Sequence, residues 1–225
     1  MRQLVIGCGE VGSAVAALLG ADSCDLGKPA PCDKYDVVHI CFPYSERFCE
    51  AVASYRQQFS PSLVVIHSTV PVGTSRKCDA VHSPVRGKHP HLLESLRVFV
   101  KYFGGELAEE AAALFPQCKV HCVSQQETTE MLKLWDTTIY GVNIALEKTI
   151  YEACQQMGVD FDVVYRHAGE TYNAGYAAMG NPEFCKYVLK HFDGPIGGHC
   201  VTNNAKLLGG WPQQIIESAG VQCES

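Results

Sequence analysis

The sequence predicts an α/β fold, in which a parallel sheet is followed by a smaller all-helical domain built around one long central helix. Two observations predict it. Short apolar runs typical of buried strands alternate with helical patterns through the first half of the chain, the order from which parallel sheets are built. From a capping box at residues 124–127 a helical pattern then continues without proline to about Met157, which is long for a helix of a globular protein.

The first apolar run leads into a glycine-rich turn of the form Gly-x-Gly-x-x-Gly, at Gly7, Gly9 and Gly12. Gly7 allows the tight turn, Gly9 allows a pyrophosphate to approach the backbone, and Gly12 allows the following helix to pack closely. Because free N–H groups at a helix start attract phosphate, we expect a Rossmann-type domain that binds a dinucleotide. The residues expected to contact it are Gly7, Cys8, Gly9, Glu10, Val11 and Gly12. In the alternative interpretation, the glycines only close a strand–helix turn.

An acidic residue is expected about twenty positions after the first glycine, where it hydrogen-bonds the ribose hydroxyls. Asp25 fits this position, and no arginine follows it directly to accept a 2′-phosphate; Lys28 is the nearest cation. The sequence therefore favours NAD over NADP as the cofactor. The alternative is that Asp25 only caps a loop.

The rest of the first domain follows from the same patterns. Residues 26–34 are too short and too rich in proline for the usual crossover helix and strand, so we expect a trimmed first half of the fold. Phe42 and Pro43 lie at the end of a buried strand, and ligands of parallel sheets lie beyond the carboxyl ends of strands. They are therefore candidates to line the nicotinamide side, or else an ordinary strand end. Strands are predicted at residues 36–42, 62–67, 97–103 and 118–123, a helix from a cap at Ser45 to about Phe59, and a loop at residues 171–182.

Composition excludes several classes of partner. The net charge of −6 and the lack of a basic run with interleaved aromatics argue against nucleic acid. No apolar run approaches the roughly 18 residues of a membrane span, and no signal peptide is apparent, so we expect a cytoplasmic protein. The twelve cysteines are scattered singly, without a Cys-x-x-Cys pair. We therefore expect buried thiols and no metal site.

A loop dense in cations and rings occupies residues 81–91. Arg86, Lys88 and His89 lie in it, and a guanidinium fork beside a point charge suits a phosphate or carboxylate. We expect this loop to bind the anionic group of a small-molecule substrate. A solvated loop is the alternative.

Three stretches resemble the UDP-glucose/GDP-mannose dehydrogenases, a family of the 6-phosphogluconate-dehydrogenase-like superfamily. HSTVPVGTSR, at residues 67–76, is similar to the family's Ser-Thr-Val-Pro-x-Gly-Thr stretch. TEMLKLWDTTIYGVNIAL, at residues 129–146, is similar to its long helix with Glu-x-x-Lys-Leu. GPIGGHC, at residues 194–200, is similar to its Gly-Pro-Gly-x-Gly-Gly-His-Cys loop. These stretches follow one another in the family's order.

The resemblance implies roles for three residues. Thr69 would touch the cofactor or a catalytic water, although a threonine there also suits a simple helix N-cap. Lys133 matches the catalytic lysine, and Cys200 matches the nucleophile that holds an aldehyde as a thiohemiacetal, so that a second hydride can leave. The residue types suit this chemistry, because a thiolate adds to a carbonyl and a lysine polarises an oxyanion or acts as a base.

Three departures distinguish this chain from the family pattern. Val85 stands where the family has glutamate, Thr137 where it has asparagine, and Asn204 where it has aspartate. The chain also stops at Ser225, so we expect the family's C-terminal nucleotide-sugar-binding domain to be absent. These changes leave open whether catalysis survives and whether the chain is an enzyme.

The interpretation that best fits these observations is an NAD-dependent oxidoreductase that oxidises an alcohol on a small anionic substrate. Two alternatives stay open: a two-electron hydroxy-acid dehydrogenase that does not use Cys200, and a catalytically impaired NAD-binding protein acting as a sensor or partner subunit. We expect a dinucleotide-binding domain over residues 1–123 and a helical substrate and dimerisation domain over residues 124–225. Apolar residues around much of the long helix predict a homodimer.

Overall fold

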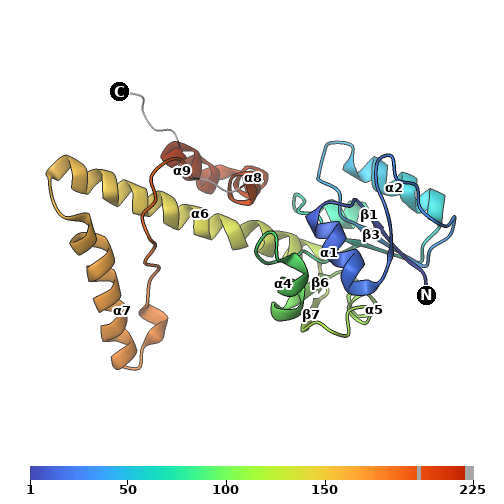
Figure 1. Cartoon of the computed structure of the whole chain (residues 1–225), viewed down its shortest axis with the longest axis horizontal. Helices are drawn as coiled ribbons and strands as arrows, with labels where there is room; N and C mark the ends of the chain where they lie inside the picture. The colour runs from blue at the N-terminus through green and yellow to red at the C-terminus, as the bar shows by residue number, and fades with distance from the viewer. Residues whose placement is uncertain (197–198, 221–225) are drawn as a thin grey trace. The chain divides into compact units, whose positions relative to one another are not determined.

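The computed structural model describes residues 1–196 and 199–220 and divides into two compact units, Met1–Lys133 and Leu134–Ser225 (Figure 1). The first unit carries a seven-stranded sheet and the second is helical. This is the predicted α/β fold, with a Rossmann-type sheet followed by a helical region. The sheet ends at Val123, where the sequence places the domain boundary, whereas the first compact unit continues to Lys133 within the long helix.

The strands of the sheet follow the order β2-β1-β3-β4-β5-β6-β7. All neighbouring strands are parallel except β5 and β6, which are antiparallel. Within the described residues no helix separates β2 from β3, so the predicted trimming of the first half is confirmed. The strands are β1 (Gln3–Ile6), β2 (Asp22–Cys24), β3 (Val37–Ile40), β4 (Leu63–Ile66), β5 (Val81–His82), β6 (Lys101–Gly104) and β7 (Val120–Val123).

Helices cover both faces of this sheet. Side chains alternate between the faces, so Val5 points into one apolar core and its neighbour Leu4 into the other. The core that contains Val5 also holds side chains from α1 (Glu10–Leu19), α4 (Leu92–Val98) and α5 (Ala108–Ala112). The opposite core holds Phe48, Val52 and Phe59 of α2 (Phe48–Phe59). Helix α3 (Thr74–Lys77) is a single short turn after β4.

The predicted strand over residues 97–103 is wrong in its first part, because α4 runs through Val98 and β6 begins at Lys101. Leu92 and Leu96, one helical turn apart, are both buried in the core, and this spacing favours a helix there. The predicted start of α2 is also displaced. Ser45 does not cap the helix with its side chain; its carbonyl accepts a hydrogen bond from the amide of Phe48, which begins the helix.

The second unit begins on the long helix α6 (Gln126–Met157), which confirms the helical pattern of the sequence. Gly158 then adopts a φ of 66°, a left-handed conformation that ends helices. After it come η1 (Asp162–His167), α7 (Ala168–Ala178), η2 (Pro182–Phe184), α8 (His199–Leu208) and α9 (Gly210–Gly220). None of the helices in the described part of the chain has both the length and the apolar character needed to cross a bilayer.

The predicted loop at residues 171–182 is wrong, because α7 continues to Ala178. Tyr172 and Tyr176 lie one turn apart with ring centroids 4.7 Å apart, and this contact stabilises the helix despite its glycines. A Cβ added at Gly169 would lie 2.7 Å from Val188, so this glycine lets the segment after η2 approach α7 closely.

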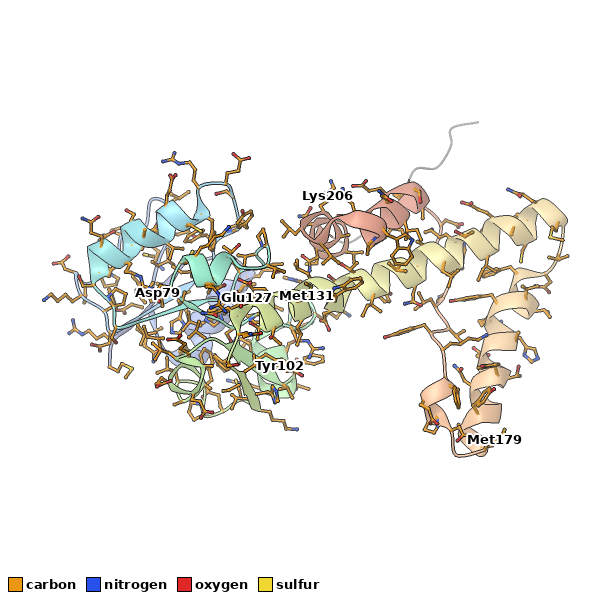
Figure 2. The ribbon with its side chains drawn as sticks, turned by 180° about the vertical axis from the view of Figure 1, so that it is seen from behind. Asp79, Tyr102, Glu127, Met131, Met179 and Lys206 are labelled. Atoms are coloured by element: carbon orange, nitrogen blue, oxygen red, sulfur yellow. The ribbon has the colours of Figure 1, made fainter. Side chains whose placement is uncertain are left out.

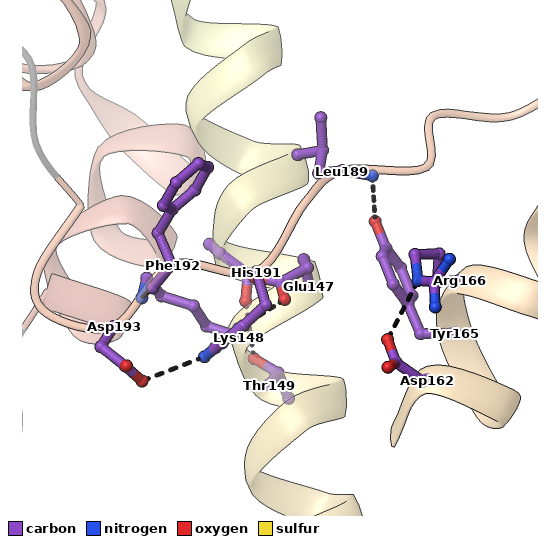
Figure 3. Close-up of polar contacts among 11 residues, drawn as sticks. Glu147, Lys148, Thr149, Asp162, Tyr165, Arg166, Leu189, His191, Phe192 and Asp193 are labelled. Atoms are coloured by element: carbon purple, nitrogen blue, oxygen red, sulfur yellow. Dashed lines mark hydrogen bonds and ion pairs between the residues drawn. The ribbon is translucent and has the colours of Figure 1, made fainter. Parts of the chain in front are cut away.

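The segment that follows η2 makes hydrogen bonds to α6 and η1 (Figure 3). The amide of Leu189 donates to the hydroxyl of Tyr165 on η1 at 3.1 Å. His191 Nδ1 lies 2.7 Å from the carboxylate of Glu147, and the Lys148 ammonium donates to the carbonyl of Phe192 at 2.8 Å. Helices α8 and α9 pack on α6 at Gly141, where an added Cβ would lie 2.5 Å from Val201 and 2.8 Å from Ile216. Val201 and Ile216 belong to the small apolar core of the second unit.

Candidate functional site

The glycine turn between β1 and α1 is shaped by contacts that exclude side chains. Gly7 has a φ of 98°, and an added Cβ would lie 2.8 Å from the amide nitrogen of Phe42. A Cβ at Gly12 would lie 1.7 Å from the carbonyl oxygen of Gly7. A larger residue at Gly12 would therefore push α1 away from the glycine turn, and one at Gly7 would collide with the backbone after β3.

Gly9 differs, because its backbone does not require glycine. It is the N-cap of α1 with a φ of −64°, and an added Cβ would have no atom within 4 Å. The amides of the first helical turn have no partner inside their own helix and face this space. The turn therefore offers room and backbone donors for a pyrophosphate, which is the fit that a dinucleotide requires.

Asp25 lies at the end of β2, beside this turn. Its carboxylate accepts hydrogen bonds from the amides of Cys8 at 2.5 Å and Leu26 at 2.7 Å. These two bonds, and secondarily Lys28, lower the pKa of the exposed Asp25 carboxyl below its ordinary value. A carboxylate has about four lone-pair positions, so acceptor capacity is left for ribose hydroxyls. The Lys28 ammonium itself is held by the hydroxyl of Ser23 at 2.8 Å.

The residues expected on the nicotinamide side lie at the carboxyl ends of β3 and β4. The hydroxyl of Ser68 donates to the carbonyl of Phe42 at 2.6 Å, which joins these two strand ends. The ring of Phe42 packs against Phe48 of α2, with centroids 5.0 Å apart. Pro43 is exposed and Thr69 is half-buried. Their predicted contacts with cofactor stay predictions.

Lys133 lies on α6, and its ammonium donates to the carbonyl of Val85 at 2.8 Å. The Val85 side chain is buried in the core of the first unit, so the backbone of this residue, and not its side chain, faces the lysine. The residue that stands in place of the family's glutamate therefore contacts the lysine through its carbonyl.

The first turns of α6 are joined to the segment that follows β4 at the carboxyl edge of the sheet. Glu130 is fully buried, and its carboxylate accepts hydrogen bonds from the amides of Gly73 at 2.5 Å and Ser75 at 2.7 Å. Glu127, labelled in Figure 2, pairs with Arg76 through two contacts of 2.5 Å and 2.9 Å. The bonds to Arg76 lower the pKa of Glu127 to about 2. The helix that carries Lys133 is thus fastened to the loop that follows Thr69.

His82 makes a third link from α6 to this edge of the sheet. Its Nε2 lies 3.2 Å from the carbonyl of Ser68, and its Nδ1 lies 2.8 Å from the hydroxyl of Thr129. Because a carbonyl only accepts, Nε2 carries the proton and Nδ1 accepts from the threonine. Sequence reasoning missed Glu130, Thr129 and His82; the Glu-x-x-Lys spacing was the one local signal that pointed to the glutamate.

A buried polar network joins side chains of β3 and β6 with residues that follow β4 and β5. It was not predicted from the sequence. His39 and His67 approach within 3.0 Å, and His67 Nδ1 lies 2.7 Å from the carbonyl of Ser83. The ammonium nitrogen of Lys101 lies 3.2 Å from the same carbonyl. Burial lowers the pKa of His39 and of His82 to about 3, that of His67 well below its ordinary value, and that of Lys101 to about 7. The network is therefore built from uncharged imidazoles.

The cationic loop contacts its own unit. The guanidinium of Arg86 lies 5.9 Å from the ring centroids of both Phe99 and Tyr102. His89 pairs with Glu10 of the glycine turn, and Lys88 is exposed. A histidine thus lies beside the acidic residue of the glycine turn, while the predicted binding of a substrate anion stays a prediction.

Cys200 is exposed on the first turn of α8, and the glycines before it, residues 197–198, lie outside the described residues. On the same helix Asn204 donates to the hydroxyl of Thr137 on α6 at 2.8 Å. Lys133 belongs to the first compact unit and Cys200 to the second. The convergence of these two side chains on one substrate is therefore a prediction. Among the described residues, no group of three or more His, Cys, Asp or Glu side chains is placed to hold a metal ion.

Known proteins share this fold and part of this sequence. No family model matches the chain. It is 26% identical over 207 residues to the UDP-N-acetyl-D-mannosamine dehydrogenase of Methanocaldococcus jannaschii, an alignment that covers 80% of this chain and 45% of that protein. The chain thus spans about half the length of this curated relative.

Solved structures of dehydrogenases share the fold of this chain. The UDP-D-ManNAc dehydrogenase of Pyrococcus horikoshii superimposes with a TM-score of 0.71 at 20% identity, over 98% of this chain and 68% of that one. A conserved protein of unknown function that resembles 3-hydroxyacid dehydrogenases superimposes with a TM-score of 0.66 at 13% identity, over 97% of this chain and 95% of that one.

Fold and glycine turn together define the class: an α/β protein with a Rossmann-type sheet, a fold that it shares with solved dehydrogenases. Within that class the chain is a relative of the UDP-glucose/GDP-mannose dehydrogenases. The resemblance predicted from the sequence motifs is confirmed.

Proposed function

We propose that this chain binds NAD and acts as an oxidoreductase similar to nucleotide-sugar dehydrogenases, oxidising an alcohol on a small anionic substrate. The observation that carries the proposal is the open space at Gly9, bounded by the first turn of α1 and by the Asp25 carboxylate. Pyrophosphate and ribose recognition need these groups side by side. The relatives named above support the reaction class.

When bound, NAD supplies the hydride acceptor. The ammonium of Lys133 then polarises the substrate oxygen or, in its neutral form, takes the hydroxyl proton. The carbonyl of Val85 accepts a hydrogen bond from this amine at 2.8 Å and orients it. The exposed thiol of Cys200 is the candidate nucleophile for a second oxidation, which needs an aldehyde to add to the sulfur. A hydroxy-acid dehydrogenase would use the lysine alone, and an impaired NAD-binding protein would use neither.

Calorimetric titration of the whole chain tests cofactor binding. We expect NAD to bind more tightly than NADP, because a 2′-phosphate would meet the Asp25 carboxylate. Gly9→Val should abolish binding by filling the space above the turn, and Asp25→Ala should weaken it. Gly175→Val is the matched control, since that glycine also has open space at its Cβ but lies on α7. Absence of NAD affinity in the wild-type chain, or a clear preference for NADP, would contradict the proposal.

We also propose a homodimer formed through the second unit. Its helices expose large apolar side chains that one copy of the unit leaves in water. These side chains are Ile139, Tyr140 and Leu146 on α6, Val163 and Val164 on η1, and Tyr172 on α7. A two-fold dimer is the simplest assembly that covers such a surface. Light scattering should give twice the chain mass of 24.6 kDa, and a monomer at all concentrations would reject the dimer.

A further inference from the structure

Two cysteines of the first unit lie in direct contact, although no sequence pattern pairs them. Cys49 is in the first turn of α2, and Cys78 is the C-cap of α3. Their sulfur atoms are 3.2 Å apart, with the Cys78 thiol donating to Cys49 Sγ. A disulfide needs a sulfur–sulfur distance of about 2.05 Å, so the two sulfurs must approach by only about 1.2 Å.

The two thiols differ in exposure and in the proton they carry. Cys49 is half-buried and open to a small reagent, whereas Cys78 is 8% exposed. Burial, together with the hydrogen bond to Cys49, raises the pKa of the Cys78 thiol to about 12. Cys78 therefore keeps its proton and donates it to Cys49 Sγ, and Cys49 is the more exposed of the two sulfur-bearing residues. The half-buried cysteine is the nucleophile, and the buried one completes the exchange.

We propose that Cys49 and Cys78 form a reversible redox modification site, at which a small disulfide such as oxidised glutathione converts the two thiols into an intramolecular disulfide.

The chemistry proceeds in two exchanges. The Cys49 thiolate attacks one sulfur of oxidised glutathione, forms a mixed disulfide and releases one glutathione thiolate, which takes up a proton. Cys78 then attacks Cys49 Sγ as its proton passes to the departing glutathione sulfur, which releases the second glutathione as a thiol. Two protein thiols and one glutathione disulfide thus become one protein disulfide and two glutathione thiols. The two electrons pass from the protein to the oxidant.

The bond would join α2 to the end of α3. Arg56 of α2 already bridges these elements, because its guanidinium donates to the carbonyl of Cys78 at 3.1 Å. The chain between the two cysteines contains β4, and it also contains Gly73 and Ser75, whose amides donate hydrogen bonds to Glu130 of α6. Closing this loop covalently restricts the unfolded chain, so the oxidised form should resist unfolding better than the reduced one.

Peptide mapping of the full chain tests the proposal. The protein is fully reduced, freed of reductant, incubated with oxidised glutathione, and alkylated before digestion and mass spectrometry. We expect a peptide pair that links Cys49 to Cys78, a loss of two titratable thiols from that pair, and a higher melting temperature. Dithiothreitol should reverse all three changes.

Single variants separate the two roles. Cys78→Ser should accumulate a glutathione adduct on Cys49, because the second thiol is missing, and Cys49→Ser should leave Cys78 unmodified, because it is buried. Cys24→Ser is the matched control, a buried cysteine of the same unit, and it should keep the cross-link. If Cys78→Ser fails to fold, the wild-type map and Cys49→Ser still decide. Glutathione adducts on the exposed Cys185 and Cys200 without a Cys49–Cys78 peptide would overturn the proposal.

Discussion

The side-chain amide of Asn204 on α8 donates a hydrogen bond to the hydroxyl of Thr137 on α6, with a nitrogen–oxygen distance of 2.8 Å. These are two of the three positions at which the chain departs from the family pattern, and the structure brings them into contact. Asn204 is 3% exposed, so the bond lies inside the second unit. A neutral amide and a hydroxyl thus satisfy each other where the family has aspartate and asparagine. The two departures form one structural unit.

Removing the Thr137 hydroxyl tests this pairing. Thr137→Val should lower the free energy of unfolding by about 1 kcal/mol, because it removes an acceptor from a buried amide. Urea denaturation measures the change. Thr149→Val is the matched control on the same helix, since the Thr149 hydroxyl donates to the carbonyl of Ala145 one turn earlier and leaves no other side chain unpaired. Equal effects of the two substitutions would show that the Asn204 contact contributes nothing.

Acid should destabilise the first unit through its buried histidines. The folded-state pKa values of His39 and His82 are lowered to about 3, while an unfolded histidine titrates near 6.5. Below pH 6.5 the unfolded chain therefore binds more protons, and stability is lost as the pH falls toward 3. The loss should approach about 1.4 kcal/mol per pH unit for each histidine. His39→Gln should reduce this slope, whereas the exposed His121→Gln should leave it unchanged.

Glu130 should stabilise the loop that carries Gly73 and Ser75. Glu130→Gln keeps the shape but presents one NH2 group to two backbone donors, so one of them loses its acceptor. We expect a loss of about 1–3 kcal/mol in the free energy of unfolding and faster amide exchange across α3. Glu127→Gln, three residues earlier, disrupts only the partly exposed pair with Arg76 and should cost under about 1 kcal/mol. Unchanged exchange at residues 73–77 in Glu130→Gln would count against the anchoring role.

Cys200 should react faster than other cysteines with an alkylating reagent if it is the nucleophile that the family resemblance implies. Cys185 is the suitable comparison, because it is also exposed, and Cys154 is a buried reference. We expect labelling in the order Cys200, Cys185, Cys154, with NAD changing the rate at Cys200 alone. Mass-spectrometric mapping over time measures these rates without a substrate. Should Cys200 and Cys185 react equally with and without NAD, covalent catalysis is no longer supported.

Much of the fold could be predicted because its signals are local. The strand, glycine turn and helix at residues 3–19 depend on contacts between near neighbours, such as Gly12 against the carbonyl of Gly7. The long helix follows from its uninterrupted pattern. Errors arose where contacts with neighbouring elements decide the local structure. The glycines and asparagine of α7 predict a loop, but Gly169 packs against Val188 of the segment after η2.

The sequence by itself determined the Rossmann-type sheet, the glycine turn and the long helix, because backbone geometry and side-chain periodicity act within a few residues of one another. Tertiary structure alone decided which groups complete the candidate site. Glu130 reaches Ser75 across 55 residues, Lys133 reaches Val85 across 48, and Asn204 reaches Thr137 across 67. Contacts between residues so far apart produce no periodic pattern in the sequence from which they could be predicted. Their partners are chosen by the packing of α6 on the sheet edge and of α8 on α6, within the respective units.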